Sequence, residues 1–260
     1  SYRPVRCVSV PSEYEVQLIR KAMLIGNKQT LSTYLHRSIS GHQIELIDAV
    51  SPLYSNPLLS FKARRKVPKK RCKNKPANFL FFSGSGLVLK GLDLLLESLA
   101  KLSPVLWRLR IVAPCEDAFV LPMAHLLEHP NVSFHGTLNL MSPKLWEIFH
   151  DSHYIVSPTC SEGQSTAVLA AMHNGLVPIA TRQVGIDLDS LGLSYIEAVT
   201  VDALTQAIDF YLSSPLPTYS QQSLICHEHI TRNHTPRNYE QSLRRALSSC
   251  GLPLNSYPPT

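Results

Sequence analysis

One stretch, residues 153–181, decides the fold: His-Tyr-Ile-Val-Ser-Pro-Thr-Cys-Ser-Glu-Gly-Gln-Ser-Thr-Ala-Val-Leu-Ala-Ala-Met-His-Asn-Gly-Leu-Val-Pro-Ile-Ala-Thr. The short apolar run Tyr154–Val156 predicts a β-strand. Ser165–His173 is rich in Ala, Leu and Met and predicts a buried helix, which Asn174-Gly175 is expected to end. Leu176–Thr181 predicts a second buried strand. The stretch is therefore a strand–loop–helix–strand unit.

The loop of this unit, Thr159–Gln164, carries one acid, Glu162, followed at once by Gly163. Open α/β sheets bind their ligands where the carboxyl end of a strand leads into a helix. The unpaired backbone N–H groups of a helix N-terminus favour phosphate. The sequence therefore predicts a ligand site around Glu162.

Similar units repeat on both sides of this stretch. The repetition of strands with helices of ten or so residues predicts an α/β fold with a Rossmann-like, doubly wound parallel sheet. The remaining expected strands are Asn78–Ser83, Leu109–Ala113, Val132–His135 and Ser194–Ala198. The remaining expected helices are Leu92–Leu102, Phe119–Glu128 (with Pro122 tolerable only in its first turn), Pro143–Asp151 and Asp202–Leu212.

The repeats define the expected domain limits. Residues 78–216 form the Rossmann-like domain, and Pro215 and Pro217 end it. Residues 1–61 contain helix and strand candidates but no complete α/β repeat, so they are expected to be part of another lobe. Residues 62–77 form a basic linker, and residues 217–260 a helical tail.

The basic linker accounts for the net charge of +6, because residues 62–75 hold nine Lys and Arg residues and no acid. Without these nine, acidic residues exceed basic ones by three. We interpret the run as a solvated linker, and a contact with an anionic membrane surface stays open. The run lacks interleaved aromatic residues, which disfavours nucleic-acid binding.

Composition limits the other function classes. No run approaches the roughly 18–20 apolar residues of a membrane span. The six cysteines lie far apart, which is typical of a reducing cytosol. Cys226 and His229 have metal-ligand spacing but no second cysteine pair, and Asp187 and Asp189 lie outside the expected ligand loops, so no metal site is predicted.

A second candidate ligand loop follows the first expected strand of the domain, at residues 83–93: Ser-Gly-Ser-Gly-Leu-Val-Leu-Lys-Gly-Leu-Asp. Its glycines let backbone approach a phosphate, and Lys90 supplies a counter-charge at the helix start. The loop matches neither the Walker A motif nor the dinucleotide Gly-x-Gly-x-x-Gly spacing. It is therefore interpreted as a phosphate loop of another kind.

Together these segments resemble the donor-site signature of GT-B glycosyltransferases of the family 4 type. That signature has the form Pro-Ser-x-x-Glu-Gly-Phe-Gly, then an Ala-Met helix, then Gly-Leu-Pro-Val-Ile-Ala. The matching residues are Ser157-Pro158 and Val177-Pro178, each in swapped order, with Ser161-Glu162-Gly163, Ala171-Met172, Gly175-Leu176 and Ile179-Ala180-Thr181. The first loop is similar to the family's Gly-Arg-Leu-x-x-x-Lys-Gly loop, and His135-Gly136-Thr137 to a third landmark near the nucleoside.

The resemblance implies a role for each candidate. Glu162 would contact the transferred sugar as the catalytic-site acid, and Lys90 would bind the donor diphosphate. Ser85 stands where the family has an arginine. Ala170 stands in the nucleoside region, where the family has a second glutamate that holds the ribose hydroxyls. The other donor-site residues implied are Gly84, Gly136, Gly163, Gln164 and Ser165.

The resemblance further implies the donor-binding C-terminal lobe of a GT-B enzyme with part of its N-terminal lobe. The reaction would move a sugar from a nucleotide diphosphate sugar to a hydroxyl of a glycan, lipid-linked or small-molecule acceptor, with retention and without metal or other cofactor. The expected location is the cytoplasm, or the inner membrane face. Residues 1–260 alone are not expected to transfer sugar. The alternative is an inactive sugar-nucleotide-binding or scaffold module, which the replacements at Ser85 and Ala170 favour.

Overall fold

The computed structural model describes residues 75–139, 142–162, 164–235, 238 and 241. Residues 55–230 belong to one compact unit, and residues 1–54 with 231–260 to another. The expected partial lobe at 1–61, most of the basic linker and the end of the helical tail lie outside the described residues.

A five-stranded parallel sheet forms the centre of the described domain, with the order β3-β2-β1-β4-β5. This order confirms the α/β, Rossmann-like fold that the repeats predict. Because the chain winds outward in both directions from the neighbours β1 and β4, the sheet is doubly wound. The strands are β1 (Ala77–Phe82), β2 (Trp107–Val112), β3 (Val132–Phe134), β4 (Tyr154–Ser157) and β5 (Val177–Ala180).

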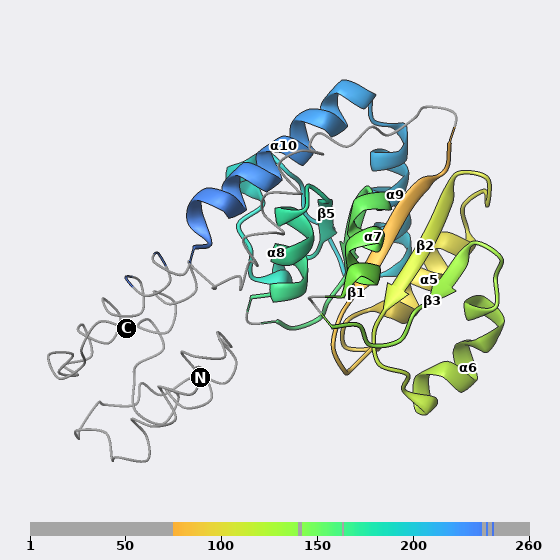
Figure 1. The fold of residues 1–260 in the computed structure, drawn as a ribbon. Coiled ribbons are helices and arrows are strands. Elements are labelled where there is room, and N and C mark those ends of the chain that lie inside the picture. Colours follow the sequence, from red (N-terminus) through yellow and green to blue (C-terminus); the bar gives the residue numbers. More distant parts are fainter. Residues whose placement is uncertain (1–74, 140–141, 163, 236–237, 239–240, 242–260) are drawn as a thin grey trace, which may run out of the picture. The chain divides into compact units, whose positions relative to one another are not determined.

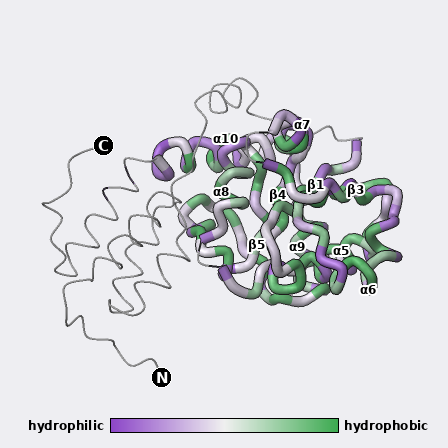
Figure 2. The backbone as a smooth tube through the Cα atoms, turned by 60° about the horizontal axis from the view of Figure 1, so that its bottom comes forward, coloured by the Kyte–Doolittle hydropathy of each residue, from purple (hydrophilic) through white to green (hydrophobic). Residues whose placement is uncertain are grey.

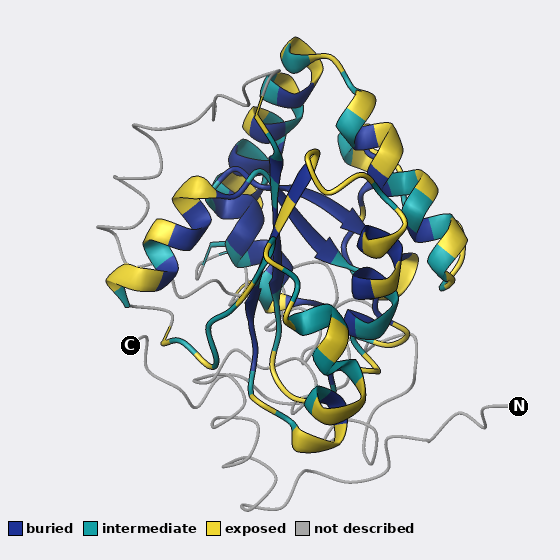
Figure 3. Cartoon of the chain, turned by 90° about the vertical axis from the view of Figure 1, so that its right-hand side faces the viewer, coloured by how far each residue is buried: buried dark blue, intermediate teal, exposed yellow. Residues whose placement is uncertain are grey.

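Helices enclose the sheet, and the central strands are buried between them (Figures 1 and 3). Helix α5 packs against α6 and α9, while α7 contacts β1, and α8 contacts β4 and β5. The bounds are α5 (Leu92–Ala100), α6 (Asp117–Leu127), α7 (Pro143–Asp151), α8 (Thr166–His173), α9 (Val201–Ser213) and α10 (Leu216–Asn233), with short 3-10 helices at Arg182–Val184 and Asp189–Leu191.

Strands β1, β4 and β5 are largely hydrophobic, as expected of strands covered on both faces, whereas β2 carries Arg108 and Arg110 and α10 carries many hydrophilic residues (Figure 2). Phe79, Tyr154 and Tyr219 form the aromatic centre of the core and are fully buried. The Phe79 and Tyr154 rings stack at 5.4 Å, and the Tyr219 ring meets Tyr154 edge-on at the same separation. This cluster joins β1, β4 and α10.

Two local expectations were wrong. Pro122 lies in the interior of α6 rather than in its first turn, so the helix tolerates the loss of one backbone donor there. Ser194–Ala198 forms no strand, and only Ile196 makes an isolated bridge, with Thr181. Helix α10 begins at Leu216 and so contains Pro217 in its first turn. Pro217 is accommodated because the first turn of a helix needs no N–H donors.

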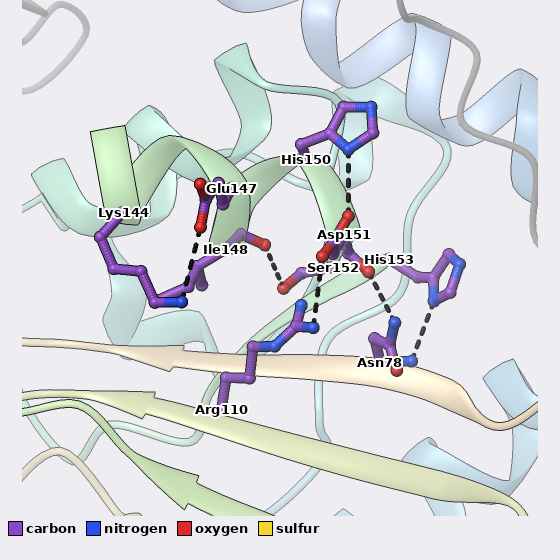
Figure 4. Close-up of polar contacts among 9 residues, drawn as sticks. All are labelled: Asn78, Arg110, Lys144, Glu147, Ile148, His150, Asp151, Ser152 and His153. Carbon is purple, nitrogen blue, oxygen red and sulfur yellow. Dashed lines mark hydrogen bonds and ion pairs between the residues drawn. The ribbon is translucent and has the colours of Figure 1, made fainter. Parts of the chain in front are cut away.

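Polar contacts fix the register between β1 and β4 (Figure 4). The Asn78 amide donates to His153 Nδ1 at 2.9 Å, and the His153 amide donates to the Asn78 carbonyl at 2.8 Å. The Asn78 side chain donates to the carbonyl of Asp151, at the end of α7, at 2.7 Å. Phe79 is thereby paired with Tyr154 and Leu80 with Ile155. The register sets how the loops that follow β1 and β4 face each other.

Candidate functional site at the carboxyl ends of β1 and β4

The candidate site lies where the direction of winding changes. Strands β1 and β4 are adjacent and parallel, so the loops that follow them leave from the same edge of the sheet. Helices α5 and α8 follow these two loops. Open α/β sheets bind ligands in the crevice at this point. The two loops that the sequence singles out are thus neighbours in space.

Lys90 and Glu162 meet between these two loops. Lys90 Nζ donates to Glu162 Oε1 in an ion pair between the first loop and the loop after β4. The two side chains are 14% and 15% exposed, respectively. Removing one partner of such a pair leaves a poorly solvated charge behind. A ligand that brings an anionic group to Lys90 and hydroxyl groups to Glu162 can satisfy both.

Backbone contacts hold the two loops together beside the ion pair. The Leu89 carbonyl accepts from the Cys160 amide at 2.9 Å and from Thr159 Oγ1 at 3.4 Å. Gly91 has a φ of +75°, and a Cβ built on it would lie 2.4 Å from the Pro158 carbonyl oxygen. Only glycine fits this close approach without displacing the loop after β4.

The first loop is also bound on its other side. The Glu116 carboxylate, just beyond β2, accepts from the Gly86 amide at 2.6 Å and from the Leu87 amide at 3.2 Å. The Gly86 carbonyl in turn accepts from the Lys90 amide at 3.0 Å. The segment that carries Lys90 is therefore tied to the loops after β2 and β4.

The N-terminus of α8 supplies the next part of the site. Ser165 is the N-cap, and its Oγ accepts from the Val168 amide at 3.5 Å. The Ser165 amide, which the resemblance offers to the donor, already donates to the Val184 carbonyl at 3.0 Å. Gln164 is buried just before the cap, and Gly163 lies outside the described residues. Ala170 is half-buried on α8, eight positions after Glu162 in the sequence.

The remaining predicted residues lie around the first loop and at the end of β3. Gly84 and Ser85 are exposed, and a Cβ on Gly84 would meet no atom within 4 Å. Gly136 follows β3, which β2 separates from β1, and its carbonyl accepts from Ala113 at 3.1 Å. Gly136 therefore follows a strand two places away in the sheet from β1, whose loop carries Lys90.

His135, beside Gly136, carries a perturbed imidazole. Burial lowers its pKa, and the nearby charges of Lys144 and Arg110 lower it further. The ring is therefore held neutral at pH 7 at the end of β3. A neutral imidazole adds no charge to this edge of the sheet.

Sequence reasoning missed Glu116, and it gave no separate role to Gly91 and Thr159, which lie inside the two predicted loops. Glu116 could have been found as an acid in the loop after an expected strand, because it follows the end of β2 by four residues, much as Glu162 follows the end of β4 by five. Gly91 follows Lys90, but the atom that excludes a side chain there is 67 positions away in the chain. No local pattern reveals such a contact.

The described residues contain neither a metal-binding cluster nor a helix suited to span a membrane. Within residues 75–139 and the later described segments, no group of three or more His, Cys, Asp or Glu side chains could hold a metal ion. In the same residues, none of the helices has both the length and the apolar character needed to cross a bilayer.

Comparison with solved structures shows how the fold is related. WaaG, described as a glycosyltransferase involved in lipopolysaccharide biosynthesis, gives a TM-score of 0.56 at 18% identity, over 75% of this chain and 51% of WaaG. A Rickettsia africae glycosyltransferase gives 0.56 at 16% identity, over 93% of this chain and 68% of that one. A TarM variant of S. aureus, in complex with UDP, Fondaparinux and alpha-GlcNAc-glycerol, gives 0.54 at 15%, over 69% and 36%.

The similarity to these glycosyltransferases is one of fold, and the chain spans about half the length of WaaG. Comparison with curated protein sequences found no match. The family model described as "Glycosyl transferases group 1" matches residues 77–214, more than half of the chain and nearly all of the described sheet and its helices. With the parallel sheet and the GT-B-like structural neighbours, this match shows that the chain belongs to the group 1 glycosyl transferases.

Proposed function

We propose that the described domain binds a nucleotide diphosphate sugar in the crevice between the loops after β1 and β4, and that the sugar is passed to an acceptor hydroxyl. The observation that carries this proposal is the ion pair between Lys90 and Glu162 at the winding change of the sheet. The TarM structure is a complex with UDP, which supports a nucleotide as a ligand of this fold.

Lys90 and Glu162 would contact different parts of the nucleotide diphosphate sugar. Lys90 would face the diphosphate, where its ammonium makes charge-assisted hydrogen bonds and stabilises the charge that develops as the diphosphate departs. Glu162 would accept hydrogen bonds from the sugar hydroxyls and orient the sugar. A carboxylate gains nothing from a phosphate oxygen, which also only accepts, so this division is the favourable one. We propose no metal ion or other cofactor for the reaction.

A thermal-shift and calorimetry screen tests the donor assignment. The probes are UDP, GDP and ADP, their glucose conjugates, and the matching nucleosides. A ligand at 100 times its Kd stabilises the folded protein by about 2.7 kcal/mol, which is a readily measured shift. Lys90→Ala should weaken binding of the diphosphates more than that of the nucleosides. Equal losses for both would show that Lys90 does not face the diphosphate.

Glu162→Gln separates the sugar from the nucleotide. Gln keeps the size of the side chain but loses the charge that strengthens a hydrogen bond to a sugar hydroxyl. Binding of the diphosphate alone should be spared or strengthened, because a negative charge near the phosphates is removed. Binding of the sugar conjugate should fall by roughly tenfold to a hundredfold. An unchanged affinity for the sugar conjugate would contradict the role of Glu162.

A donor-binding module without catalysis is the second candidate. Its specific support is that Ser85 and Ala170 replace an arginine and a glutamate of the family signature, and Ser85 is exposed with no charge to offer. The two candidates differ in transfer, not in binding. Donor hydrolysis or transfer by the full-length protein supports the enzyme, whereas calorimetric binding without either reaction supports the module.

A further inference from the structure

We propose that Glu116 is a positioning residue that fixes the first loop and, through it, the ammonium group of Lys90. This inference rests on the proposed function, because it gives Lys90 the diphosphate as its ligand. Glu116 lies outside both sequence segments that carry the donor-site signature.

The Glu116 side chain is directed away from its own helix. Glu116 is the N-cap of α6, yet its carboxylate makes no capping hydrogen bond to that helix. An N-cap side chain ordinarily accepts from an amide two or three residues on. Here both carboxylate oxygens instead accept from the first loop, 30 and 29 residues back, at 2.6 and 3.2 Å.

The Glu116 carboxylate matches, in charge and geometry, the two backbone amides from which it accepts hydrogen bonds. Gly86 and Leu87 open a helical turn that leads into α5, and their amides are its first donors. Two successive amides of this kind form a small anion-binding concavity, and hydrogen bonds to a carboxylate are about twice as strong as neutral ones. Residue 86 has a φ of +86°, a backbone conformation that favours glycine.

Lys90 depends on the same turn. The Gly86 carbonyl accepts from the Lys90 amide at 3.0 Å, and the Leu87 carbonyl accepts from Leu92 at 3.0 Å. Gly86 and Leu87 therefore link Glu116 to the site: their amides donate to Glu116, and their carbonyls accept from Lys90 and from the first residue of α5. Thr159 and Cys160 bind Leu89 from the opposite side. Loss of the Glu116 contact leaves the turn of residues 86–90 attached to the loop after β4, through Leu89 and the Lys90–Glu162 ion pair.

The sign of the effect on anion binding separates positioning from simple charge. Glu116 is negative, so if it acted only as a nearby charge, its removal would strengthen the binding of UDP, GDP, ADP and inorganic pyrophosphate. If it positions Lys90, Glu116→Ala weakens their binding by about tenfold and leaves nucleoside binding unchanged. Asp117→Ala is the matched control, because Asp117 is the neighbouring acid and is exposed.

A double-mutant cycle tests whether the effect passes through Lys90. In a Lys90→Ala background, Glu116→Ala should change diphosphate affinity by less than about twofold, since residues in one network do not act additively. Additive losses, or stronger binding by Glu116→Ala than by wild type, would overturn the proposal. Stronger binding would show that the carboxylate opposes the anionic ligand, as a nearby charge or as a competitor for the two amides.

Hydrogen exchange provides a measurement that needs no ligand. In Glu116→Ala, the amides of Gly86, Leu87 and Lys90 should exchange faster, while those of β4 and α8 keep their protection. Unchanged exchange at Lys90 overturns the proposal, whatever binds. If the wild-type protein binds none of the nucleotides, the proposed function is refuted, and the exchange result alone then decides whether Glu116 positions the loop.

Discussion

At the scale of single residues, Gly91 is a point of close approach between the backbones of the two loops of the candidate site. Its φ is +75°, and an added Cβ would lie 2.4 Å from Pro158 O and 2.8 Å from Pro158 Cγ. The contact joins the end of the first loop to the loop that carries Glu162. A side chain at Gly91 therefore affects both backbone strain and the distance between the loops.

We expect Gly91→Ala to lower the free energy of unfolding by at least about 2 kcal/mol, because a left-handed conformation and a clash with backbone add together. Urea denaturation measures the change. Gly84→Ala is the control, since a Cβ there meets nothing within 4 Å, and its effect should stay within about 0.5 kcal/mol. Equal effects of the two substitutions would contradict the close approach.

Ala170 tests whether the nucleoside region still accepts a ribose. It is half-buried on α8, so a longer side chain can reach solvent or ligand. If the site binds a nucleotide, Ala170→Glu should tighten binding of the diphosphate by roughly tenfold, through a charged hydrogen bond to a ribose hydroxyl. Calorimetry measures the affinity, and Ala170→Gln supplies the shape without the charge. Weaker binding by the glutamate variant would place the ribose elsewhere.

At the scale of secondary-structure elements, α10 docks on α8 through buried polar contacts. Ser223 Oγ donates to the Gly175 carbonyl at 2.6 Å, and His227 Nδ1 lies 2.5 Å from the His173 carbonyl oxygen. The His173 and His227 rings stack at 5.6 Å. These contacts satisfy carbonyls at the C-terminus of α8, where intrahelical donors run out. They keep in place the helix that leads out of the donor site.

We expect Ser223→Ala to lower the free energy of unfolding by about 1–2 kcal/mol, because it takes a donor from a buried carbonyl. Ser220→Ala, at a half-buried position of the same helix, should change it by less than about 0.5 kcal/mol. Chemical denaturation of the two variants decides the matter. A neutral result for Ser223→Ala would mean that the Gly175 carbonyl finds another donor.

Cys226 reports on the same docking. Burial raises the pKa of its thiol to about 12, so at pH 8 it holds roughly a thousandfold less thiolate than an ordinary cysteine. Maleimide should label the exposed Cys115 and Cys160 in the folded protein, and Cys226 only after unfolding. Peptide mapping by mass spectrometry measures this. Early labelling of Cys226 would show that α10 detaches readily.

At the scale of the whole molecule, two histidines make stability depend on pH. Burial lowers the pKa of His135, with Lys144 and Arg110 adding to the effect. Burial also lowers the pKa of His229, and Asp187 partly opposes it. Between the ordinary pKa of about 6.5 and the lower folded values, the unfolded chain binds more protons. The free energy of unfolding therefore falls as the pH falls through this range.

Urea denaturation at pH 7.5 and pH 5.5 tests this. The wild-type protein should lose more stability on acidification than a variant with His135→Gln and His229→Gln, which cannot take up these two protons. The comparison with the variant removes the contribution of carboxylates, which is common to both proteins. An identical pH dependence would assign the acid sensitivity to other groups.

The sequence by itself determined the fold class and the two loops of the candidate site. Alternating strands and helices predict a parallel sheet, because each short apolar run must be buried by the helix that follows it. Lys90 and Glu162 were identified from their places after strands, and Pro143–Asp151 was predicted to the residue. Periodicity and helix-stop residues act over a few positions, so they can be recognised without knowledge of the rest of the chain.

Only the tertiary structure decided which distant groups meet. The ion pair between Lys90 and Glu162 spans 72 residues, and the hydrogen bonds of Glu116 to the first loop span 30 and 29. The close approach of Gly91 to Pro158 and the loss of a strand at Ser194–Ala198 likewise depend on neighbours far along the chain. These outcomes follow from strand order and register, which are set by packing of the whole sheet and leave no local trace in sequence.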